Sequence, residues 1–341
     1  MKIAILTGGG DAPGLNQTIR AVVKTGESHG IEIIAVRGGW AGLVDLNSSP
    51  ITWKDVEGIS GKGGTVIGSG RTNPLKMPNG IKRVSDNLGK IADGLIAMGG
   101  EDTLGVALGM YKGGVKVVGV PKTIDNDLDS TDYTIGFDTA LNTTVEAIDR
   151  SRTTGESHDR FMVIEVMGRH AGWLALHSGL ASGADLILLP EEPFDLDEIT
   201  NHIQKLKDSG KRTGIIVAAE GAHLKETSAA TVEKGKLDEF GHVRLGGVGE
   251  FLAKEIGKRA GVETRYVVIG HIARGGVPSA FDRVFGTRLG VEAIKLVKDG
   301  KWGQMLSLRG TKIISMPLED GVAKLKTVTS DFIETKDAMT R

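Results

Sequence analysis

A lysine, a threonine and two aspartates stand close together after an apolar run, in the segment Lys122–Asp127. Asp125 and Asp127 lie two residues apart, and in such a pair one carboxylate can accept a proton while the other organises a metal ion. A turn rich in aspartate and asparagine would also give this pattern, but two earlier loops of similar character precede it. We therefore predict that the catalytic residues are Lys122, Thr123, Asp125 and Asp127.

Two glycine-rich loops also follow apolar runs. Thr7–Gly14 carries three consecutive glycines, and Gly99–Thr103 carries two glycines followed by Glu101 and Asp102. Glycines expose backbone N–H groups and a following helix adds its positive end, so both loops suit a phosphate. Acids beside a phosphate suit Mg2+, which prefers carboxylate and phosphate oxygens. Tight turns and acidic helix starts give the same patterns without a ligand, so each loop alone leaves that alternative open.

The second half of the sequence supplies cations at the ends of apolar runs. Arg160 and Arg265 each precede such a run, whereas Met167–His170, Glu220 and Gly270–Gly276 each follow one. Arginine and histidine gathered at strand ends would hold an anionic sugar phosphate. Each of these charges alone is more often a solvated surface group, and the methionine alone is more often part of a core.

Short apolar runs alternate with longer amphipathic segments along most of the chain. This alternation predicts parallel sheets covered by helices, since strands buried on both faces lack polar alternation. The expected strands are Ile3–Leu6, Ile31–Val36, Gly94–Met98, Val115–Val120, Phe161–Val166, Asp185–Leu189, Gly214–Ala219 and Tyr266–Ile269. The expected helices are Leu15–His29, Asp102–Tyr111, Thr139–Thr153, Ala171–Ser182, Leu196–Asp208, Gly247–Lys258 and Phe281–Asp299. The pattern is too long for one comfortable sheet, so we expect two α/β lobes, with a boundary near Gly136–Thr139.

Composition excludes several classes of protein. The 341 residues carry a formal net charge of −1, which gives no reason to expect nucleic-acid or membrane partners. The absence of cysteine excludes disulfides, thiolate catalysis and zinc held by cysteine. The apolar run in Met1–Thr7 is too short for a signal peptide, and no stretch approaches a membrane span, so we expect a cytoplasmic protein. Residues 227–245 are polar and charged and predict an exposed loop or hairpin.

Taken together in order, these motifs resemble those of 6-phosphofructokinases. The resemblance covers nearly the whole chain, and its pieces are Gly8–Gly14, Pro121–Asp127, Asp132–Phe137, Ala147–Arg150, Val166–Arg169 and Gly270–Gly276. It implies an α/β fold of two Rossmann-like parallel-sheet lobes with the active site between them. The implied domains are residues 1–137 plus approximately 252–310 for the phosphate donor and 138–251 for the sugar phosphate, with 311–341 packing on either.

The resemblance also implies roles for individual residues. Donor contacts would come from Gly10, Arg71, Gly100, Asp102 and Thr103, and Glu101 would be associated with Mg2+. Asp125 would be the base that accepts the proton of the sugar 1-hydroxyl. The sugar phosphate would contact Thr123, Asp125, Met167, Gly168, Arg169, Glu220, His271 and Arg274, together with Arg160 and Arg265 from a neighbouring subunit. A homodimer or homotetramer with shared sites would follow.

Two departures from the ATP-using bacterial pattern bear on the donor. This chain has Gly99-Gly100-Glu101-Asp102 where Gly-Gly-Asp-Gly is common, and Pro121-Lys122-Thr123 where Pro-Gly-Thr is common. Asp102 would fill and charge the space that a nucleotide α-phosphate needs. Two unit charges about 4 Å apart repel by about 4 kcal/mol at an effective dielectric of about 20, which is roughly a thousandfold in affinity. Lys122 would neutralise Asp102 and donate to a phosphate.

The expected activity is therefore diphosphate-dependent phosphofructokinase, reversible and placed in glycolysis and gluconeogenesis, with ATP as the alternative donor. NAD kinase-type enzymes share Gly-Gly-Asp loops but lack a Gly-His-Ile-Ala-Arg-Gly-Gly segment. A non-enzymatic sugar-phosphate sensor would not need Asp125, and a Rossmann dehydrogenase would need Gly-x-Gly-x-x-Gly, which the first loop lacks. Allosteric control stays open, because Arg20, Lys24 and Arg152 fall near positions that bind effectors in regulated bacterial relatives.

Overall fold

The computed structural model describes residues 1–225 and 246–340, and the chain divides into two compact units. Unit 1 comprises Met1–Ile124, Leu128–Thr139 and Arg274–Leu325. Unit 2 comprises Asp125–Asp127, Ala140–Ala273 and Lys326–Arg341. The loop or hairpin expected at 227–245 lies outside the described residues. In the part of the chain that the structure describes, no helix is long and apolar enough to cross a membrane.

Unit 1 is built on a sheet with the strand order β11-β10-β5-β4-β1-β2-β3. Its inner strands run parallel: β1 (Lys2–Thr7), β2 (Glu32–Val36), β4 (Gly94–Gly99), β5 (Val117–Pro121) and β10 (Gln304–Arg309). The edge strands β3 (Ser48–Pro50) and β11 (Lys312–Pro317) pair antiparallel with their neighbours. The strands β4 and β5 are buried throughout, which explains why their sequences are apolar without alternation.

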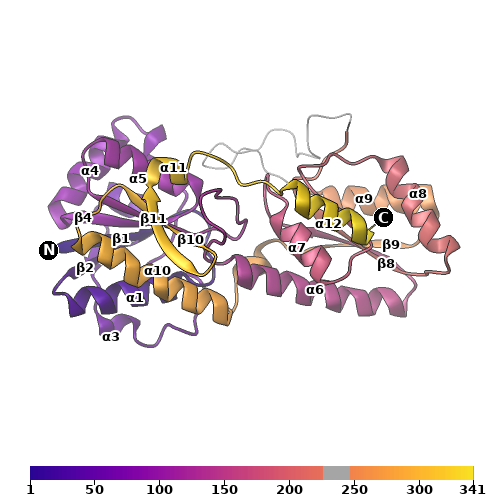
Figure 1. Cartoon of the computed structure of the whole chain (residues 1–341), viewed down its shortest axis with the longest axis horizontal. Helices are drawn as coiled ribbons and strands as arrows, with labels where there is room; N and C mark the ends of the chain where they lie inside the picture. The colour runs from indigo at the N-terminus through magenta and orange to yellow at the C-terminus, as the bar shows by residue number, and fades with distance from the viewer. Residues whose placement is uncertain (226–245, 341) are drawn as a thin grey trace. The chain divides into compact units, whose positions relative to one another are not determined.

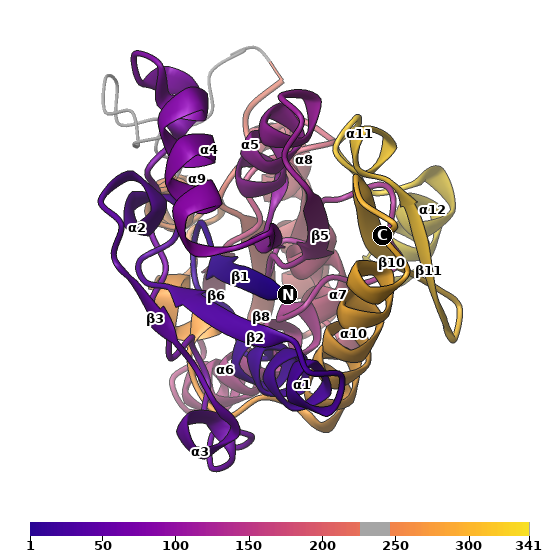
Figure 2. The ribbon, with the colours of Figure 1, turned by 90° about the vertical axis from the view of Figure 1, so that its left-hand side faces the viewer.

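Helices cover both faces of this sheet (Figure 2). On one face α1 (Leu15–Ser28) and α10 (Ala280–Lys298) lie side by side and pack on Ile3 and Ile5 of β1. On the other face α4 (Gly80–Ile91) and α5 (Glu101–Lys112) pack on Ala4 and Leu6. The unit is completed by the short segments α2 (Trp40–Val44), α3 (Trp53–Val56), η1 (Pro74–Lys76) and α11 (Leu318–Gly321). Successive β1 side chains therefore serve opposite layers, as a sheet buried on both faces requires.

Unit 2 is built on a parallel sheet with the strand order β7-β8-β6-β9 (Figure 1). These strands are β6 (Phe161–Val166), β7 (Leu186–Leu188), β8 (Gly214–Ala219) and β9 (Thr264–Val268). The helices are α6 (Phe137–Ser157), α7 (Trp173–Ala181), α8 (Leu196–Asp208), α9 (Val248–Ala260) and α12 (Ser330–Thr340). The first turn of α6 belongs to unit 1, and the 3-10 helix η2 (Gly270–Arg274) follows β9. The apolar residues of α8 and α9 pack on Phe161 and Val163 of β6, and these contacts form the hydrophobic core of unit 2.

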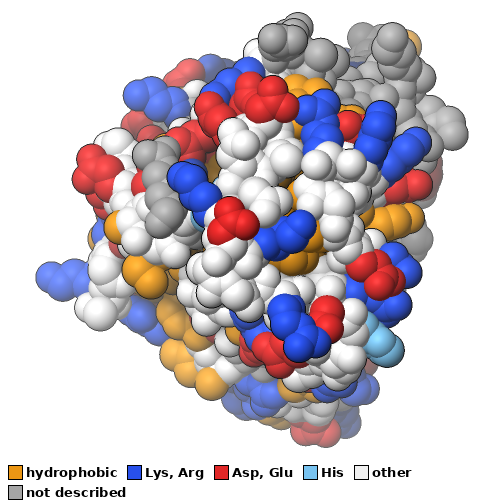
Figure 3. All heavy atoms as spheres, turned by 90° about the vertical axis from the view of Figure 1, so that its right-hand side faces the viewer, with side chains coloured by type: hydrophobic (Ala, Val, Ile, Leu, Met, Phe, Trp, Pro, Cys, Tyr) orange, Lys and Arg blue, Asp and Glu red, His pale blue; other side chains and the backbone are white. Residues whose placement is uncertain are grey.

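Charges of both signs are interspersed on the face of the molecule drawn in Figure 3. In unit 2, Lys225 pairs with Glu198 at 2.7 Å and Arg259 pairs with Asp197 at 2.7 Å. Exposed pairs of this kind contribute little to stability. The mixture of positive and negative side chains agrees with the formal net charge of −1.

The expectation of two α/β lobes on parallel sheets is confirmed, whereas the predicted bounds of the lobes need correction. The chain returns to unit 1 at Arg274, not near residue 252. The reason is that β9 pairs with β6 from Thr264 to Val268 and α9 packs on the same sheet, so both elements complete unit 2. The C-terminal segment 311–341 divides between the units, with β11 in unit 1 and α12 in unit 2.

Candidate active site

The loop between β1 and α1 depends on glycines that no other residue could replace without strain. A Cβ on Gly8 would lie 2.5 Å from Thr103 Oγ1, and Gly9 has a φ of +77°. The N–H of Gly8 donates to Met98 O at 2.9 Å, and the N–H of Gly9 donates to Gly70 O at 2.9 Å. The loop is therefore fixed to neighbouring segments, with little room for side chains of its own.

Arg71 lies on the segment that borders this loop. Ser69 Oγ donates to Gly9 O at 2.7 Å, so the chain just before Arg71 is bonded to the loop. The Arg71 side chain is half-buried. Its predicted donor contact stays a prediction, and its backbone place beside the loop agrees with it.

The second acidic loop leads directly into α5. Gly100 precedes the helix, and Glu101 and Asp102 occupy its first turn, where carboxylates interact favourably with the helix dipole. Glu101 is exposed and Asp102 is half-buried, whereas Thr103 is buried with its side chain against Gly8. Thr103 thus joins the two glycine loops in unit 1.

Lys122 directs its ammonium group at the first loop. The residue is 2% exposed, and its Nζ donates to Gly8 O at 2.8 Å and to Gly10 O at 2.5 Å. Its own N–H donates to Gly99 O at 3.0 Å, which sets it beside the second loop as well. A buried ammonium requires such partners. The predicted pairing of Lys122 with Asp102 stays a prediction.

Arg274 lies in the same unit and against the same loop. It is 8% exposed, and a Cβ on Gly10 would lie 2.6 Å from its Nη1. Nη1 donates to Asp11 O at a long 3.4 Å. The resemblance assigned Arg274 to the sugar phosphate, but within unit 1 its contacts are with the predicted donor loop.

In unit 2, Glu220 fixes the loop that follows β6. Its Oε1 accepts the N–H of Arg169 at 3.0 Å and that of Gly168 at 3.3 Å. Arg169 has a φ of 52° and Gly168 a φ of 144°, and a positive φ at a non-glycine residue persists only where surrounding contacts hold it. The structure therefore brings Met167, Gly168, Arg169 and Glu220 together, while His271 lies exposed in η2, just after β9.

Asp125 belongs to unit 2 and acts electrostatically on Glu220. Burial raises the pKa of the Glu220 carboxyl, the negative charge of Asp125 raises it further, and the two backbone donors oppose the rise. Asp125 itself is 4% exposed. The carbonyl of Asp127 accepts the N–H of Lys326 at 2.8 Å, which holds this short stretch to unit 2. A buried carboxylate, Asp125, and a half-buried one, Glu220, thus interact electrostatically at the predicted catalytic position.

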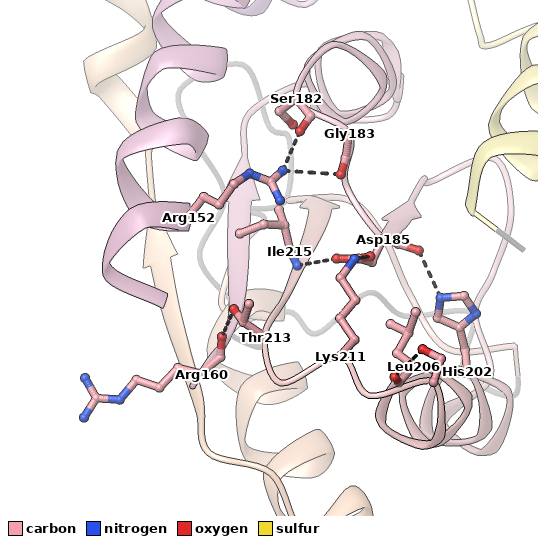
Figure 4. A network of polar contacts seen from close by, with 11 residues as sticks. Arg152, Arg160, Ser182, Gly183, Asp185, His202, Leu206, Lys211, Thr213 and Ile215 are labelled. Atoms are coloured by element: carbon pink, nitrogen blue, oxygen red, sulfur yellow. Dashed lines mark hydrogen bonds and ion pairs between the residues drawn. The ribbon is translucent and has the colours of Figure 1, made fainter. Parts of the chain in front are cut away.

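Arg160 and Arg265 lie at the other end of the unit 2 strands. Arg160 Nε and Arg265 Nη2 each donate to Glu263 Oε1 at 2.8 Å. Arg160 precedes β6, whose six residues span about 20 Å at about 3.3 Å per residue, so neither arginine joins Arg169 in the same subunit. Figure 4 shows the Arg160 side chain extending away from the contacts drawn around β8.

The residues near effector positions of regulated relatives contact their own unit. Arg20 and Lys24 each stack on the Trp53 ring, 4.5 Å from its centroid. Arg152 donates through Nη2 to the carbonyl of Ser182 (Figure 4).

Among the described residues, no cluster of three or more His, Asp or Glu could hold a metal ion. Mg2+ in phosphoryl-transfer sites is usually bound by one or two carboxylates plus substrate phosphates. Glu101 offers an exposed carboxylate next to Gly100. This set of oxygen donors fits a Mg2+ that arrives with, and is held mainly by, the phosphates of a donor.

Asp282 is a buried acid that belongs to none of the sequence motifs described above. Its Oδ1 accepts the N–H of Gly136 at 2.8 Å, and its Oδ2 accepts the N–H of Thr139 at 2.8 Å and its Oγ1 at 2.5 Å. Burial raises the pKa of Asp282 to about 6, and these hydrogen bonds oppose the rise. The sequence signal for a buried Asp282 is its spacing of three and seven residues from Phe285 and Leu289, which places all three on the buried face of α10.

Residues 2–297 match the family model described as phosphofructokinase. The chain belongs to the phosphofructokinase family. Relatives called pyrophosphate–fructose 6-phosphate 1-phosphotransferase in Amycolatopsis methanolica and Streptomyces coelicolor are 53% and 52% identical, over 98% of this chain and 98% of their own. A phosphofructokinase called ATP-dependent 6-phosphofructokinase 3, also from Streptomyces coelicolor, is 46% identical over 96% of both chains.

Solved phosphofructokinase structures share this fold. The phosphofructokinase of Saccharomyces cerevisiae is 31% identical, with a TM-score of 0.82 over 99% of this chain and 48% of the yeast chain. This phosphofructokinase thus spans about half the length of the yeast protein. A pyrophosphate-dependent phosphofructokinase from Marinobacter aquaeolei has a TM-score of 0.81, over 99% of this chain and 91% of its own. Its sequence is 23% identical, so this comparison shows a shared fold alone.

Proposed function

We propose that this phosphofructokinase transfers a phosphoryl group from pyrophosphate to the 1-hydroxyl of D-fructose 6-phosphate, reversibly, in glycolysis and gluconeogenesis. The products are fructose 1,6-bisphosphate and orthophosphate. The observation that carries the choice of donor is the Lys122 ammonium on the Gly8–Gly10 loop. In the common ATP-using pattern glycine stands at this position, and two relatives of 52–53% identity bear the name pyrophosphate–fructose 6-phosphate 1-phosphotransferase.

Unit 1 is proposed to bind the donor. Lys122 would donate to the leaving phosphate, Gly10 would let that phosphate approach the backbone, and Arg71 would reach it from the bordering segment. Thr103 and Gly100 shape the same edge of the sheet. Mg2+, when bound with the donor near Glu101, would neutralise phosphate charge. Preorganised cations at the place where charge develops stabilise the transition state most effectively.

Unit 2 is proposed to bind the sugar phosphate. Asp125 would accept the proton of the sugar 1-hydroxyl as the hydroxyl oxygen forms a bond to the terminal phosphorus of the donor. At the same time the bridging P–O bond of the donor would break, and its electron pair would go to the leaving phosphate. Asp127 would help to organise the metal, and Thr123 precedes this stretch in sequence. The remaining contacts would come from Met167, Gly168, Arg169, Glu220 and His271. Because Lys122, Thr123 and Asp125 lie on one short segment, the donor cation and the base are linked through the chain.

Asp102 is proposed to discriminate against ATP. It is half-buried in the first turn of α5, where the ATP-using pattern has glycine. A carboxylate there would repel an α-phosphate and occupy its space. ATP-dependent phosphofructokinase remains the second candidate, because a relative of that name is 46% identical.

A homo-oligomer, dimer or tetramer, is proposed on two observations in unit 2. Arg160 and Arg265 are too far from Arg169 along β6 to serve the same sugar phosphate in one chain. The strand β9 lies at the edge of its sheet, and its side chains Tyr266 and Val268 are 45% and 49% exposed. Such an edge is open to a second copy, whose sugar site would receive these arginines. A cytoplasmic location is proposed for an enzyme of these phosphorylated substrates.

Phosphorus NMR of the complete reaction tests this function. With wild-type protein, Mg2+, fructose 6-phosphate and pyrophosphate, we expect the pyrophosphate signal to fall as orthophosphate and a second sugar-phosphate signal appear together. The Asp125→Ser variant, incubated in parallel, should leave the pyrophosphate intact and so rule out a contaminating pyrophosphatase. Orthophosphate formed without a new sugar-phosphate signal would contradict the proposal.

A further inference from the structure

The catalytic stretch Asp125–Asp127 has a backbone that needs support from other parts of the chain. Asn126, between the two aspartates, has a φ of 53° and is 3% exposed. A positive φ at a residue other than glycine persists only where surrounding contacts hold it. Because a catalytic group must stay in place to within a fraction of an ångström, the contacts that hold this stretch bear directly on the position of the Asp125 carboxylate.

The C-terminal part of the chain supplies one of these contacts. The N–H of Lys326 donates to Asp127 O at 2.8 Å. Directly beside this hydrogen bond, Leu128 and Leu325 form an antiparallel bridge, so the two segments run side by side in opposite directions. Asp127 and Lys326 both belong to unit 2, although Leu128 and Leu325 belong to unit 1. The hydrogen bond therefore joins the catalytic stretch to a part of unit 2 that comes from the far end of the sequence.

Lys326 is itself held by residues of unit 2. Trp173 is 4% exposed, and its Nε1 donates to Lys326 O at 2.8 Å. The Lys326 ammonium lies over the same ring, 5.1 Å from its centroid. Two residues later, the N–H of Val328 donates to Glu191 Oε1 at 2.9 Å, and this oxygen also accepts the N–H of Gly172 at 2.9 Å. The segment Lys326–Val328, which we call the C-terminal brace, is thus bonded to the start of α7.

The helix α12 anchors the brace from its other end. Phe332 packs edge-on against Trp173, with 5.4 Å between the ring centroids, and lies 5.3 Å from the His177 ring. Lys336 is 8% exposed, and its Nζ pairs with Glu192 Oε2 at 2.5 Å. A buried ion pair is costly to break. The brace is therefore fixed on both sides, which makes it a rigid support for the backbone that it contacts.

We propose that the C-terminal brace positions Asp125 for catalysis, with Lys326 and Trp173 as the positioning residues. Lys326 acts through its backbone N–H on Asp127 O, and Trp173 acts through Lys326. The brace moves no proton and no phosphate. It limits the movement of the catalytic backbone, and a displacement of about 1 Å can cost about a hundredfold in rate. The inference rests on the proposed role of Asp125 as the base, but not on the identity of the phosphate donor.

Two substitutions test the brace. Lys326→Pro removes the N–H that Asp127 accepts, and Trp173→Phe removes the indole donor but keeps a ring against Phe332. We expect each to lower kcat by at least about tenfold, while the Kd values of fructose 6-phosphate and pyrophosphate change by less than about threefold. Lys326→Ala keeps the N–H and should lose less than about threefold in kcat. Trp302→Phe, in unit 1, is the control for the loss of an indole and should leave kcat unchanged.

The Asp125→Ser background separates positioning from a general loss of structure. If the brace acts through Asp125, adding Lys326→Pro or Trp173→Phe to Asp125→Ser should lower the remaining kcat by less than about threefold. A purely structural effect would lower kcat by the same factor in both backgrounds. Single-turnover kinetics, normalised to the sites that bind fructose 6-phosphate, provide the measurement.

Failure of the inference and failure of the proposed base give different results. An equal loss of kcat in both backgrounds, or a loss that appears only in the KM values, would overturn the inference while the proposed function stands. Near-normal kcat in Asp125→Ser would remove the base, and the inference with it. If the wild type prefers ATP, the same comparison made with ATP decides. If Lys326→Pro no longer binds fructose 6-phosphate, Trp173→Phe decides, and an unchanged kcat in Trp173→Phe would refute the brace.

Discussion

The N–H of Arg169 donates to the Glu220 carboxylate at 3.0 Å, and this contact holds Arg169 at a φ of 52°. The carboxylate therefore maintains a backbone conformation that the residue would otherwise rarely adopt. Glu220 directly follows β8. Arg169 is a predicted sugar-phosphate contact, so we expect sugar binding to depend on Glu220 as well.

Replacing Glu220 should loosen this loop. We predict that Glu220→Ala raises the KM for fructose 6-phosphate by about tenfold or more and lowers the unfolding free energy by about 1–3 kcal/mol, because two backbone donors lose their acceptor. Glu220→Gln keeps an acceptor oxygen and should recover much of the stability. Steady-state kinetics with both substrates varied, together with urea unfolding, provide the measurement. A Glu220→Ala enzyme with unchanged KM would mean that the loop is held by other contacts.

The buried Asp282 should make stability depend on pH. Its pKa is raised from 3.8 to about 6, so between about pH 4 and pH 6 the folded state binds the proton that the unfolded state releases. The contribution of Asp282 to the unfolding free energy is therefore largest below about pH 4 and decreases as the pH rises to about 6. A shift of this size corresponds to about 3 kcal/mol.

Comparison with Asp282→Asn isolates this effect. We predict that the difference in unfolding free energy, variant minus wild type, becomes more positive by up to about 3 kcal/mol between pH 4 and pH 6. Asp138→Asn is a suitable control, because the Asp138 charge also raises the Asp282 pKa and its removal should shift the transition to lower pH. Urea unfolding across this range is the measurement, and parallel curves for wild type and Asp282→Asn would refute the shifted pKa.

Asp125 should act on the chemical step. We predict that Asp125→Ser lowers kcat by on the order of a hundredfold or more with little change in fructose 6-phosphate affinity, because the hydroxyl loses its proton acceptor. Asp129→Ser is the matched control, since Asp129 is exposed and lies outside the predicted site. Single-turnover kinetics and equilibrium binding separate the two effects. Near-normal turnover by Asp125→Ser would remove the residue from this role.

Arg160 should serve the site of a neighbouring copy. We predict that Asp125→Ser and Arg160→Ala proteins, each weakly active alone, regain part of the wild-type activity after mixing and reassembly. A hybrid would contain a site with both an intact base and an intact arginine. Hybrids need to be verified by differential tagging. If verified hybrids show only the summed activities of their parents, sites are not shared between subunits.

The sequence predicted most accurately the elements with a clear local pattern, either an apolar run or an amphipathic helix with a capping residue. The strands β6 and β8 and the helix α8 form with the predicted bounds. The start of α8 is fixed by Asp195, whose side chain accepts the N–H groups of Asp197 and Glu198. In contrast, β11 was missed because it is an edge strand with mostly exposed residues, and its pairing with β10 rather than its own pattern determines it.

The place of Arg274 could not be predicted from the sequence. The sequence gives its position after His271, but not the residue at which the chain crosses back into unit 1. That crossing depends on β9 completing the second sheet, which is a tertiary relationship. The glycine loops, by comparison, were recognisable because each follows a buried strand and leads into a helix, a local pattern with a local cause.

Two substitutions should separate the effects on the two donors. Asp102→Gly should raise the use of ATP, because it removes both bulk and negative charge. Lys122→Gly should lower pyrophosphate-dependent kcat, because it removes a cation from the Gly8–Gly10 loop. The effects of the two substitutions should not be additive if the side chains interact. Additive effects would show that the two positions act independently.

The most direct measurement is kcat/KM of the wild-type enzyme for pyrophosphate and for ATP, at fixed Mg2+ and saturating fructose 6-phosphate. We predict that pyrophosphate is preferred by about a hundredfold or more, because Asp102 repels an α-phosphate and Lys122 supports a donor that has no nucleoside. A strong preference for ATP would contradict the proposed donor and leave only membership of the phosphofructokinase family.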